Sequence, residues 1–136
     1  MNNIEMNPQQ QAVIMELQMI EQKMKQLEAQ ISAIQKQTGE MEGIIESLAA
    51  VERNNGEEML LPIGKGIFIK NKPTSKNVLL NIGSGTVIEK DIKGTIKLID
   101  EQITKLNEMA AEYQLEMMKS EKKIEEMIEG IQKTQQ

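Results

Sequence analysis

The sequence of 136 residues contains no cysteine and no histidine. This excludes thiol nucleophiles, histidine general bases, zinc-finger and iron–sulfur sites, and any disulfide framework. Aromatic residues are almost as scarce, because only Phe68 and Tyr113 belong to this class. Aromatic rings supply much of the buried area of globular cores, so a compact enzyme with a deep pocket is not expected.

Long apolar runs and an excess of basic residues are also missing. No stretch approaches the ~18 consecutive apolar residues of a membrane span, and the first five residues lack the features of a signal peptide. We therefore expect a cytoplasmic protein with no membrane partner. The net charge is −5. A nucleic-acid-binding surface, by contrast, needs clustered Lys and Arg residues with aromatic residues between them. Nucleic acid is not expected as a partner either.

What the chain does contain is typical of long paired helices. Charged residues make up 27% and hydrophobic residues 39%, with 11 Met and only 3 Pro. Residues 1–52 carry three Lys and eight Glu (net −5), residues 53–91 six bases and four acids (+2), and residues 92–136 seven bases and nine acids (−2). Two acidic segments therefore flank a mildly basic centre.

The first segment predicts one long helix over 8–52. Asn7 before Pro8 is typical of an N-cap followed by the first helical residue. Beyond them, apolar residues recur at alternating spacings of four and three, which is the 3.5-residue period of a coiled coil. We call this stripe the seam, and in the first helix it comprises Val13, Leu17, Ile20, Met24, Leu27, Ile31, Ile34, Thr38, Met41, Ile45, Leu48 and Glu52. Ten of these twelve positions are apolar.

The last segment predicts a second helix over 91–136, with Asp91 as its N-cap. Its seam comprises Ile92, Ile96, Ile99, Ile103, Leu106, Ala110, Tyr113, Met117, Ser120, Ile124, Met127, Ile131 and Thr134, of which only Ser120 and Thr134 interrupt the apolar pattern. Two helices of nearly equal length joined by a short insert most simply fold back on each other. We therefore expect a long antiparallel two-helix coiled coil. Pairing positions whose numbers sum to about 144, such as Leu27 with Met117, aligns the two seams.

Between the helices, residues 57–90 contain four short β-rich runs. Gly64-Lys65-Gly66 separates the first two runs and Gly83-Ser84-Gly85 the last two, which predicts two consecutive β-hairpins. Two hairpins of this size are marginal alone, and their open edges invite pairing with other chains. We therefore expect an assembly interface in which these apolar side chains are buried: Leu60, Ile67, Ile69, Val78, Leu80 and Ile82.

The glycine-containing segments are best explained as turns, and the acidic residues as solvent-exposed surface. A phosphate-binding Walker loop needs two Gly five apart, followed by Lys and Ser or Thr opening a helix, whereas these glycines lie between strands. Adjacent carboxylates such as Glu57-Glu58 splay across a surface, and no segment has the oxygen spacing of a calcium loop. We predict no catalytic residue, no cofactor and no metal.

Six apolar residues near the chain ends lie off the seam: Ile14, Met15, Met19, Leu115, Met118 and Ile128. In an antiparallel pair they gather toward the open end. Unbranched Met side chains adapt to many shapes and suit promiscuous apolar surfaces. The set therefore predicts a surface that binds other polypeptides. The alternative is that these residues only maintain the helix and have no binding role. For Ile14 and Ile128, which flank the seam, broadening of the seam is a further alternative.

Gly39 and Gly43 lie within the first predicted helix. Each weakens a helix by roughly 1 kcal/mol relative to Ala. They are interpreted either as a flexible point or as a change without functional effect.

The order of helix, two hairpins and helix resembles the α subunits of the prefoldin family over nearly the whole chain. The specific motifs are Leu61-Pro62-Ile63-Gly64-Lys65-Gly66 in the first hairpin and Val78-Leu79-Leu80-Asn81-Ile82-Gly83-Ser84-Gly85 in the second. The resemblance implies an archaeal-type α2β4 hexamer with β-subunit partners. In it the hairpins form a double β-barrel body from which six coiled-coil arms hang. It also implies that the arm tips hold unfolded polypeptide without ATP and pass it to a group II chaperonin.

The expected fold class is mainly α with a small β part, in a single prefoldin-like domain over 1–136. The expected function is that of a chaperone subunit that holds unfolded proteins. The alternative is a structural protein, either a coiled-coil spacer or a filament-forming relative of prefoldin. Suppression of the aggregation of a denatured test protein separates the two, because a spacer should not suppress it.

Overall fold

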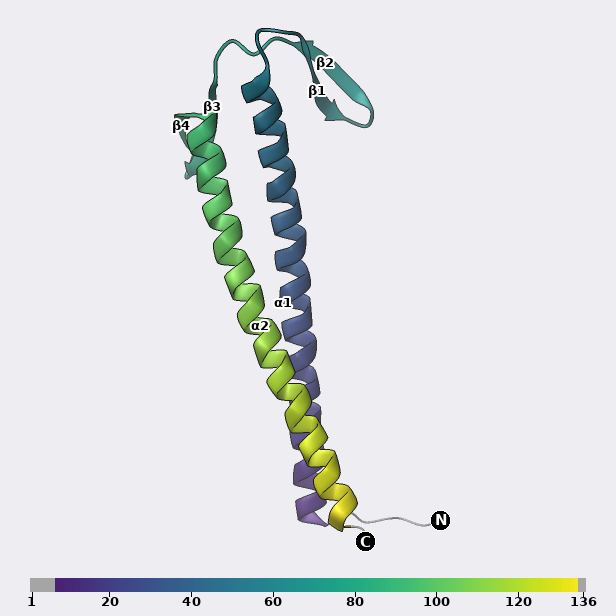
Figure 1. Cartoon of the computed structure of the whole chain (residues 1–136). Helices are drawn as coiled ribbons and strands as arrows, with labels where there is room; N and C mark the ends of the chain where they lie inside the picture. Colours follow the sequence, from purple (N-terminus) through teal and green to yellow (C-terminus); the bar gives the residue numbers. More distant parts are fainter. Residues whose placement is uncertain (1–6, 135–136) are drawn as a thin grey trace. The chain divides into compact units, whose positions relative to one another are not determined.

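The computed structural model describes residues 7–134 and consists of two long helices joined by two β-hairpins (Figure 1). In chain order the elements are α1 (Pro8–Arg53), β1 (Met59–Gly64), β2 (Ile67–Asn71), β3 (Asn77–Gly83), β4 (Thr86–Asp91) and α2 (Ile92–Thr134). The expected fold class is confirmed. Residues 135 and 136, which the prediction included in the second helix, lie outside the described residues.

The chain divides into two compact units. The terminal unit is made of Met1–Gln37 and Leu106–Gln136, so its described part contains the beginning of α1 and the end of α2. The hairpin unit is Thr38–Lys105, which contains the end of α1, both hairpins and the beginning of α2. Each unit is described by itself below.

Helix α1 begins with a reciprocal pair of hydrogen bonds. The Gln10 main-chain N–H donates to Asn7 Oδ1 at 2.7 Å, and the Asn7 N–H donates to Gln10 Oε1 at 3.2 Å. This is the arrangement of a capping box, which satisfies main-chain N–H groups that the first helical turn leaves without partners. The prediction of Asn7 as N-cap is confirmed.

In the terminal unit the two helices run antiparallel. Glu16 Oε1 lies 3.1 Å from Lys123 Nζ, and Lys23 Nζ lies 4.0 Å from Glu116 Oε2, so a later residue of α1 contacts an earlier residue of α2. Each of these four residues immediately precedes a seam position. The two ion pairs fall between neighbouring layers of the predicted seam register, with which they therefore agree.

The seam is where the helices lose their exposure. Every described side chain of the seam is buried or half-buried, including the polar Thr38, Glu52 and Ser120. The buried apolar residues are Leu27, Ile31 and Ile34 in the terminal unit and Ile92 and Ile103 in the hairpin unit. In each unit, the buried apolar side chains therefore lie at seam positions of the helices.

Both hairpins close with the same turn. Lys65 and Gly66 have φ values of 49° and 76°, and Ser84 and Gly85 have φ values of 51° and 75°. Positive φ at both central residues defines the type I′ turn, whose twist matches that of paired strands. Each turn is preceded by an irregularity in the strand register, at Gly64 and at Gly83. The prediction that these glycines make hairpin turns is confirmed.

The hairpins form two separate two-stranded antiparallel sheets, β1–β2 and β3–β4. Within residues 7–134 no strand of one hairpin pairs with a strand of the other, so the described chain contains no closed barrel. The double barrel implied by the family resemblance would thus need strands from other chains.

The hairpin β3–β4 is partly covered by its own chain, whereas in β1–β2 only Met59 is half-buried. Val78, Leu80 and Lys90 are half-buried, and the Lys90 side chain passes over the first turn of α2. A Cβ atom added to Gly94 would lie 3.1 Å from Lys90 Cε and 2.6 Å from Asp91 Oδ1. Glycine at this position therefore allows the side chains of Lys90 and Asp91 to lie against the helix.

Candidate functional site

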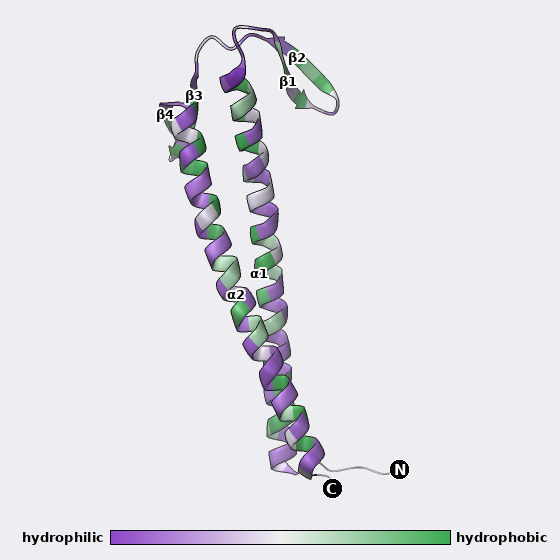
Figure 2. Cartoon of the chain, viewed as in Figure 1, coloured by the Kyte–Doolittle hydropathy of each residue, from purple (hydrophilic) through white to green (hydrophobic). Residues whose placement is uncertain are grey.

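Within residues 7–134 no group of three or more carboxylate, His or Cys side chains could hold a metal ion. In the same part of the chain no helix is both long and apolar enough to cross a membrane. The described residues do include many large apolar side chains that are exposed. Figure 2, coloured by hydropathy, shows that hydrophobic residues (green) occur along both helices and on the hairpins.

The first exposed apolar surface lies in the terminal unit. We call it the helix-end set, and it consists of the six residues predicted from the sequence: Ile14, Met15, Met19, Leu115, Met118 and Ile128. Met15, Met19, Leu115 and Met118 are 52–70% exposed, Ile128 is 44% exposed, and Ile14 is half-buried. Because Ile14 directly follows a seam position, broadening of the seam accounts for its burial.

The two ion pairs of the terminal unit fix where the helix-end set lies along the helices. Met15 and Met19 bracket Glu16, which contacts Lys123, while Leu115 and Met118 bracket Glu116, which contacts Lys23. The two ion pairs are separated by seven residues, or roughly 10 Å of helix. The four most exposed side chains therefore fall within about two to three helical turns of one another.

Around the helices, however, these four side chains do not form a single patch. Met19 lies on the flank that carries the ion pairs, because it is three residues after Glu16 and four before Lys23. Met118 directly follows the seam residue Met117 and lies toward the opposite flank. Met15 and Leu115, two residues beyond a seam position, lie on the outer sides of their helices. The set therefore surrounds the helix pair and can be approached from several directions.

The second exposed apolar surface lies on the hairpins. Leu61 pairs with Ile69 and Pro62 pairs with Phe68, and cross-strand partners share a face while successive residues alternate between faces. Both faces of β1–β2 are thus apolar, and all its residues except Met59 are exposed. Apolar side chains exposed on both faces of a two-stranded sheet indicate a sheet that other elements cover.

The residues predicted for assembly are found on these hairpins with different degrees of exposure. Leu60, Ile67, Ile69 and Ile82 are exposed, whereas Val78 and Leu80 are half-buried by their own chain. The prediction omitted further exposed apolar residues of the same strands: Leu61, Ile63, Phe68, Leu79, Val87 and Ile88. Their signal was available, because they lie in the same β-rich runs. Leu61 and Ile88 even share a face with the predicted Ile69 and Leu80, which are their cross-strand partners.

A further apolar feature lies on α1 in the hairpin unit, and the sequence pattern did not predict it. Ile44 is 51% exposed, although it immediately precedes the seam residue Ile45. It borders a shallow open groove lined by Glu40, Gly43, Ile44, Ser47, Leu48 and Val51. All these residues come from one side of α1, so the groove is a surface depression and not an enclosed site.

These features define a class of protein: two long helices, antiparallel in the terminal unit, whose connection carries two β-hairpins that do not pair with each other. The family described as Prefoldin subunit matches residues 20–136 of the chain. The chain belongs to the prefoldin family, a family of molecular chaperones that form oligomers. The resemblance drawn from the two Gly-x-Gly hairpins is therefore confirmed.

Curated relatives agree with this assignment. The chain is 35% identical over 63 residues to a prefoldin subunit alpha of Nitrosopumilus maritimus, covering 46% of this chain and 43% of the relative. It is 31% identical over 90 residues to that of Methanoculleus marisnigri (65% and 60%) and 30% identical over 93 residues to that of Pyrococcus horikoshii (68% and 62%). The matches thus span about two fifths to three fifths of the length of these relatives.

A solved structure shows the same fold. The cryo-EM structure of a filamentous PFD from Methanocaldococcus jannaschii matches with a TM-score of 0.69. The match covers 83% of this chain and 95% of that chain, at 18% sequence identity. At this identity the likeness concerns the fold alone.

Proposed function

We propose that the chain is an α-type subunit of a hetero-oligomeric, ATP-independent holdase. In this proposal the helix-end set captures unfolded polypeptide, and the hairpins join the chain to β-type subunits in an α2β4 hexamer. The captured polypeptide is delivered to a group II chaperonin in the cytoplasm. The chain's membership of a chaperone family supports the general function. The two exposed apolar surfaces support separate roles, with capture assigned to the helix-end set and assembly to the hairpins.

The observation that carries the capture step is the exposure of four large apolar side chains in the terminal unit. Met15, Met19, Leu115 and Met118 remain 52–70% exposed although a seam runs beside them. Unfolded chains expose apolar side chains in no fixed geometry, so a useful binding surface has to adapt. Flexible Met side chains placed around the helix pair meet this requirement.

The affinity of such a surface would come from repetition. Complete burial of one Met contributes roughly 1.5–3 kcal/mol, and a partial, shifting contact contributes less. Several side chains on one chain, repeated on the arms of an oligomer, raise the effective concentration for each further contact. Weak single contacts thereby become a tight but reversible grip.

The test replaces Met15, Met19, Leu115 and Met118 by Gln together. Gln retains helix propensity and similar length while removing the apolar side-chain end. The quadruple variant should assemble as the parent does but lose most of its ability to suppress aggregation of a chemically denatured protein, measured by light scattering. Its loss should exceed that of any single replacement, because the contacts act together.

A matched control is the double variant L98Q/M109Q. Both residues are exposed apolar side chains off the seam and lie outside the helix-end set. The control should suppress aggregation as well as the parent. Full activity of the quadruple variant would contradict the capture role of the helix-end set.

A structural role is the second candidate, as a spacer or as a subunit of a filament. One observation favours it: the structural neighbour is described as filamentous. Electron microscopy of the purified chain alone, across a range of concentrations, tests this candidate. Filaments without suppression of aggregation would support it over the holdase.

A further inference from the structure

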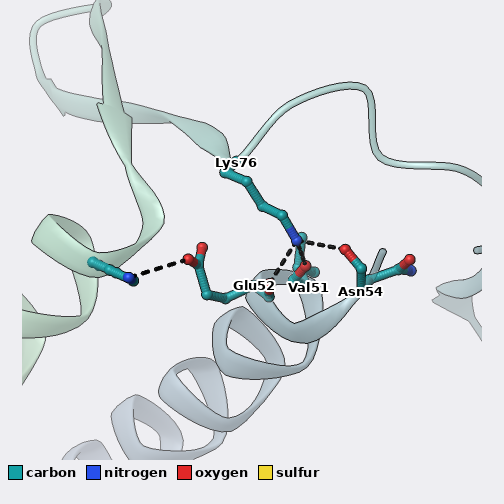
Figure 3. A network of polar contacts seen from close by, with 5 residues as sticks. Val51, Glu52, Asn54 and Lys76 are labelled. Carbon is teal, nitrogen blue, oxygen red and sulfur yellow. Dashed lines mark hydrogen bonds and ion pairs between the residues drawn. The ribbon is translucent and has the colours of Figure 1, made fainter. Parts of the chain in front are cut away.

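One lysine between the two hairpins closes the end of helix α1. Lys76 Nζ donates to the main-chain oxygens of Val51 at 2.9 Å, Glu52 at 2.6 Å and Asn54 at 2.5 Å (Figure 3). Helix α1 ends at Arg53, so these are carbonyl groups of its last turn and of the residue that follows. The donor lies 22–25 residues further along the chain than its acceptors.

The chemistry of this contact suits a helix C-terminus. The last carbonyl groups of a helix lack partners within the helix and carry a partial negative charge. An ammonium group has three N–H donors and no acceptor, and here all three donors are used on carbonyl oxygens. Hydrogen bonds from a charged donor are stronger than those between neutral groups.

The main chain of the same residue holds the beginning of the other helix. The N–H of Ile92, the first residue of α2, donates to the Lys76 carbonyl oxygen at 2.9 Å. Ile92 is fully buried, so its N–H needs a partner within the protein. Lys76 therefore serves one end of each helix, with its side chain at α1 and its main chain at α2.

The same contacts involve both segments that connect hairpin β1–β2 to the rest of the chain. The connection from α1 to β1 begins at Asn54, whose side chain exchanges two hydrogen bonds with the main chain of Glu57, at 2.6 and 2.9 Å. The connection from β2 to β3 ends at Lys76, immediately before β3. The bond from Lys76 to the Asn54 carbonyl thus joins the two connections directly.

We infer that Lys76 is a positioning residue for the hairpins, which fixes the place where β1–β2 leaves the helices. The strands of this hairpin are exposed except for Met59, so its own side chains provide little anchoring. Without the ammonium group the two connections would separate and the last turn of α1 would fray. The consequence for oligomers rests on the proposed role of the hairpins in assembly.

The test compares the full-length variants K76M, K76R and K72M by hydrogen exchange and by assembly. Methionine keeps an apolar stem of similar length but removes the three donors, whereas arginine keeps a charged donor group. Lys72 is an exposed lysine of the same connection, and K72M is the matched control. In K76M, the hydrogen-bonded amides of Asn54, Glu57 and Ile92 should exchange about tenfold faster or more, because a charge-assisted network has been lost.

Amides of residues 20–34 should exchange as in the parent in all three variants, and K76R should restore slow exchange at Asn54, Glu57 and Ile92. Assembly is measured by co-purification with a β-type prefoldin subunit. The concentration of K76M that gives half-complete assembly should be about tenfold higher than that of the parent. K72M should assemble at the same concentration as the parent. Unchanged exchange at these three amides in K76M would overturn the inference, as would faster exchange with unaltered assembly. The parent's own suppression of aggregation tests the proposed function separately, since it does not depend on this lysine being the positioning group.

Discussion

The helices and the hairpins of this chain treat their apolar residues in opposite ways. In both units the described side chains of the seam are buried or half-buried, so within each unit the helices cover their own apolar stripe. On the hairpins most large apolar side chains are exposed, and on β1–β2 they occupy both faces. Two helices of one chain can bury their apolar seam against each other, whereas two isolated two-stranded sheets cannot bury their apolar faces. The difference separates what the chain stabilises by itself from what needs a partner.

The largest expected effect is on assembly. Replacing Ile69 by Lys should abolish oligomer formation, because a charge would be buried without a partner in the assembled sheet. Helical content measured by circular dichroism should stay the same, since Ile69 is exposed in the single chain. T74K, which adds the same charge to the exposed connection between the hairpins, is the control and should assemble. Normal assembly of I69K by size exclusion would remove the contrast between helices and hairpins.

A second prediction concerns the stability of the terminal unit. Leu27 is 5% exposed and Met19 is 70% exposed, although both lie in α1. Leu27→Ala should lower the free energy of unfolding by about 2–4 kcal/mol, through lost burial and a residual cavity. Met19→Ala should change it by less than about 0.5 kcal/mol, as for other surface substitutions. Urea denaturation followed by circular dichroism measures both, and equal effects would mean that the seam is not the core.

Two helical glycines sharpen the comparison on a smaller scale. Nothing lies within 4 Å of a Cβ atom added to Gly43, so Gly43→Ala should stabilise the chain by about 0.5–1 kcal/mol. The same replacement at Gly94 would place Cβ 2.6 Å from Asp91 Oδ1. Gly94→Ala should therefore fail to stabilise and should disturb the junction of β4 with α2. Thermal unfolding of the two variants checks the prediction, which an equal gain at both sites would contradict.

The smallest expected effect belongs to the ion pair between Glu16 and Lys123. Both side chains are more than half exposed, so their interaction should contribute only about 0.2–0.5 kcal/mol. A double-mutant cycle with Glu16→Gln and Lys123→Met measures this coupling. The coupling should shrink at 1 M salt, where charges are screened within about 3 Å. A coupling of several kcal/mol would indicate that charge, and not the seam, holds the terminal unit together.

Much of this architecture could be predicted because its signals are local. The 3.5-residue period identifies the seam at each position, including the polar Thr38, which the structure buries. The two Gly-x-Gly sequences identify the hairpins, since type I′ turns need positive φ at both central residues.

Other features left no sequence signal. The acceptors of Lys76 are main-chain carbonyl groups 22–25 residues away, and such groups are the same in every residue. The partial cover of Val78 and Leu80 depends on how β4 continues into α2, which strand patterns do not encode. The residues of the helix-end set could be chosen from the sequence, because they are apolar residues outside the seam. Their distribution around both flanks could be assigned only from the ion pairs, which fix the register of the two helices.

The most direct test of the division of labour uses photo-cross-linking at two equally exposed positions. Met19 of the helix-end set is 70% exposed and Leu79 of β3 is 73% exposed. A photoreactive amino acid at either position, in the assembled oligomer with a chemically denatured protein, reports what that surface contacts. We predict adducts with the denatured protein from position 19 and adducts with a neighbouring subunit from position 79. Adducts with the denatured protein from position 79 and none from position 19 would contradict the account.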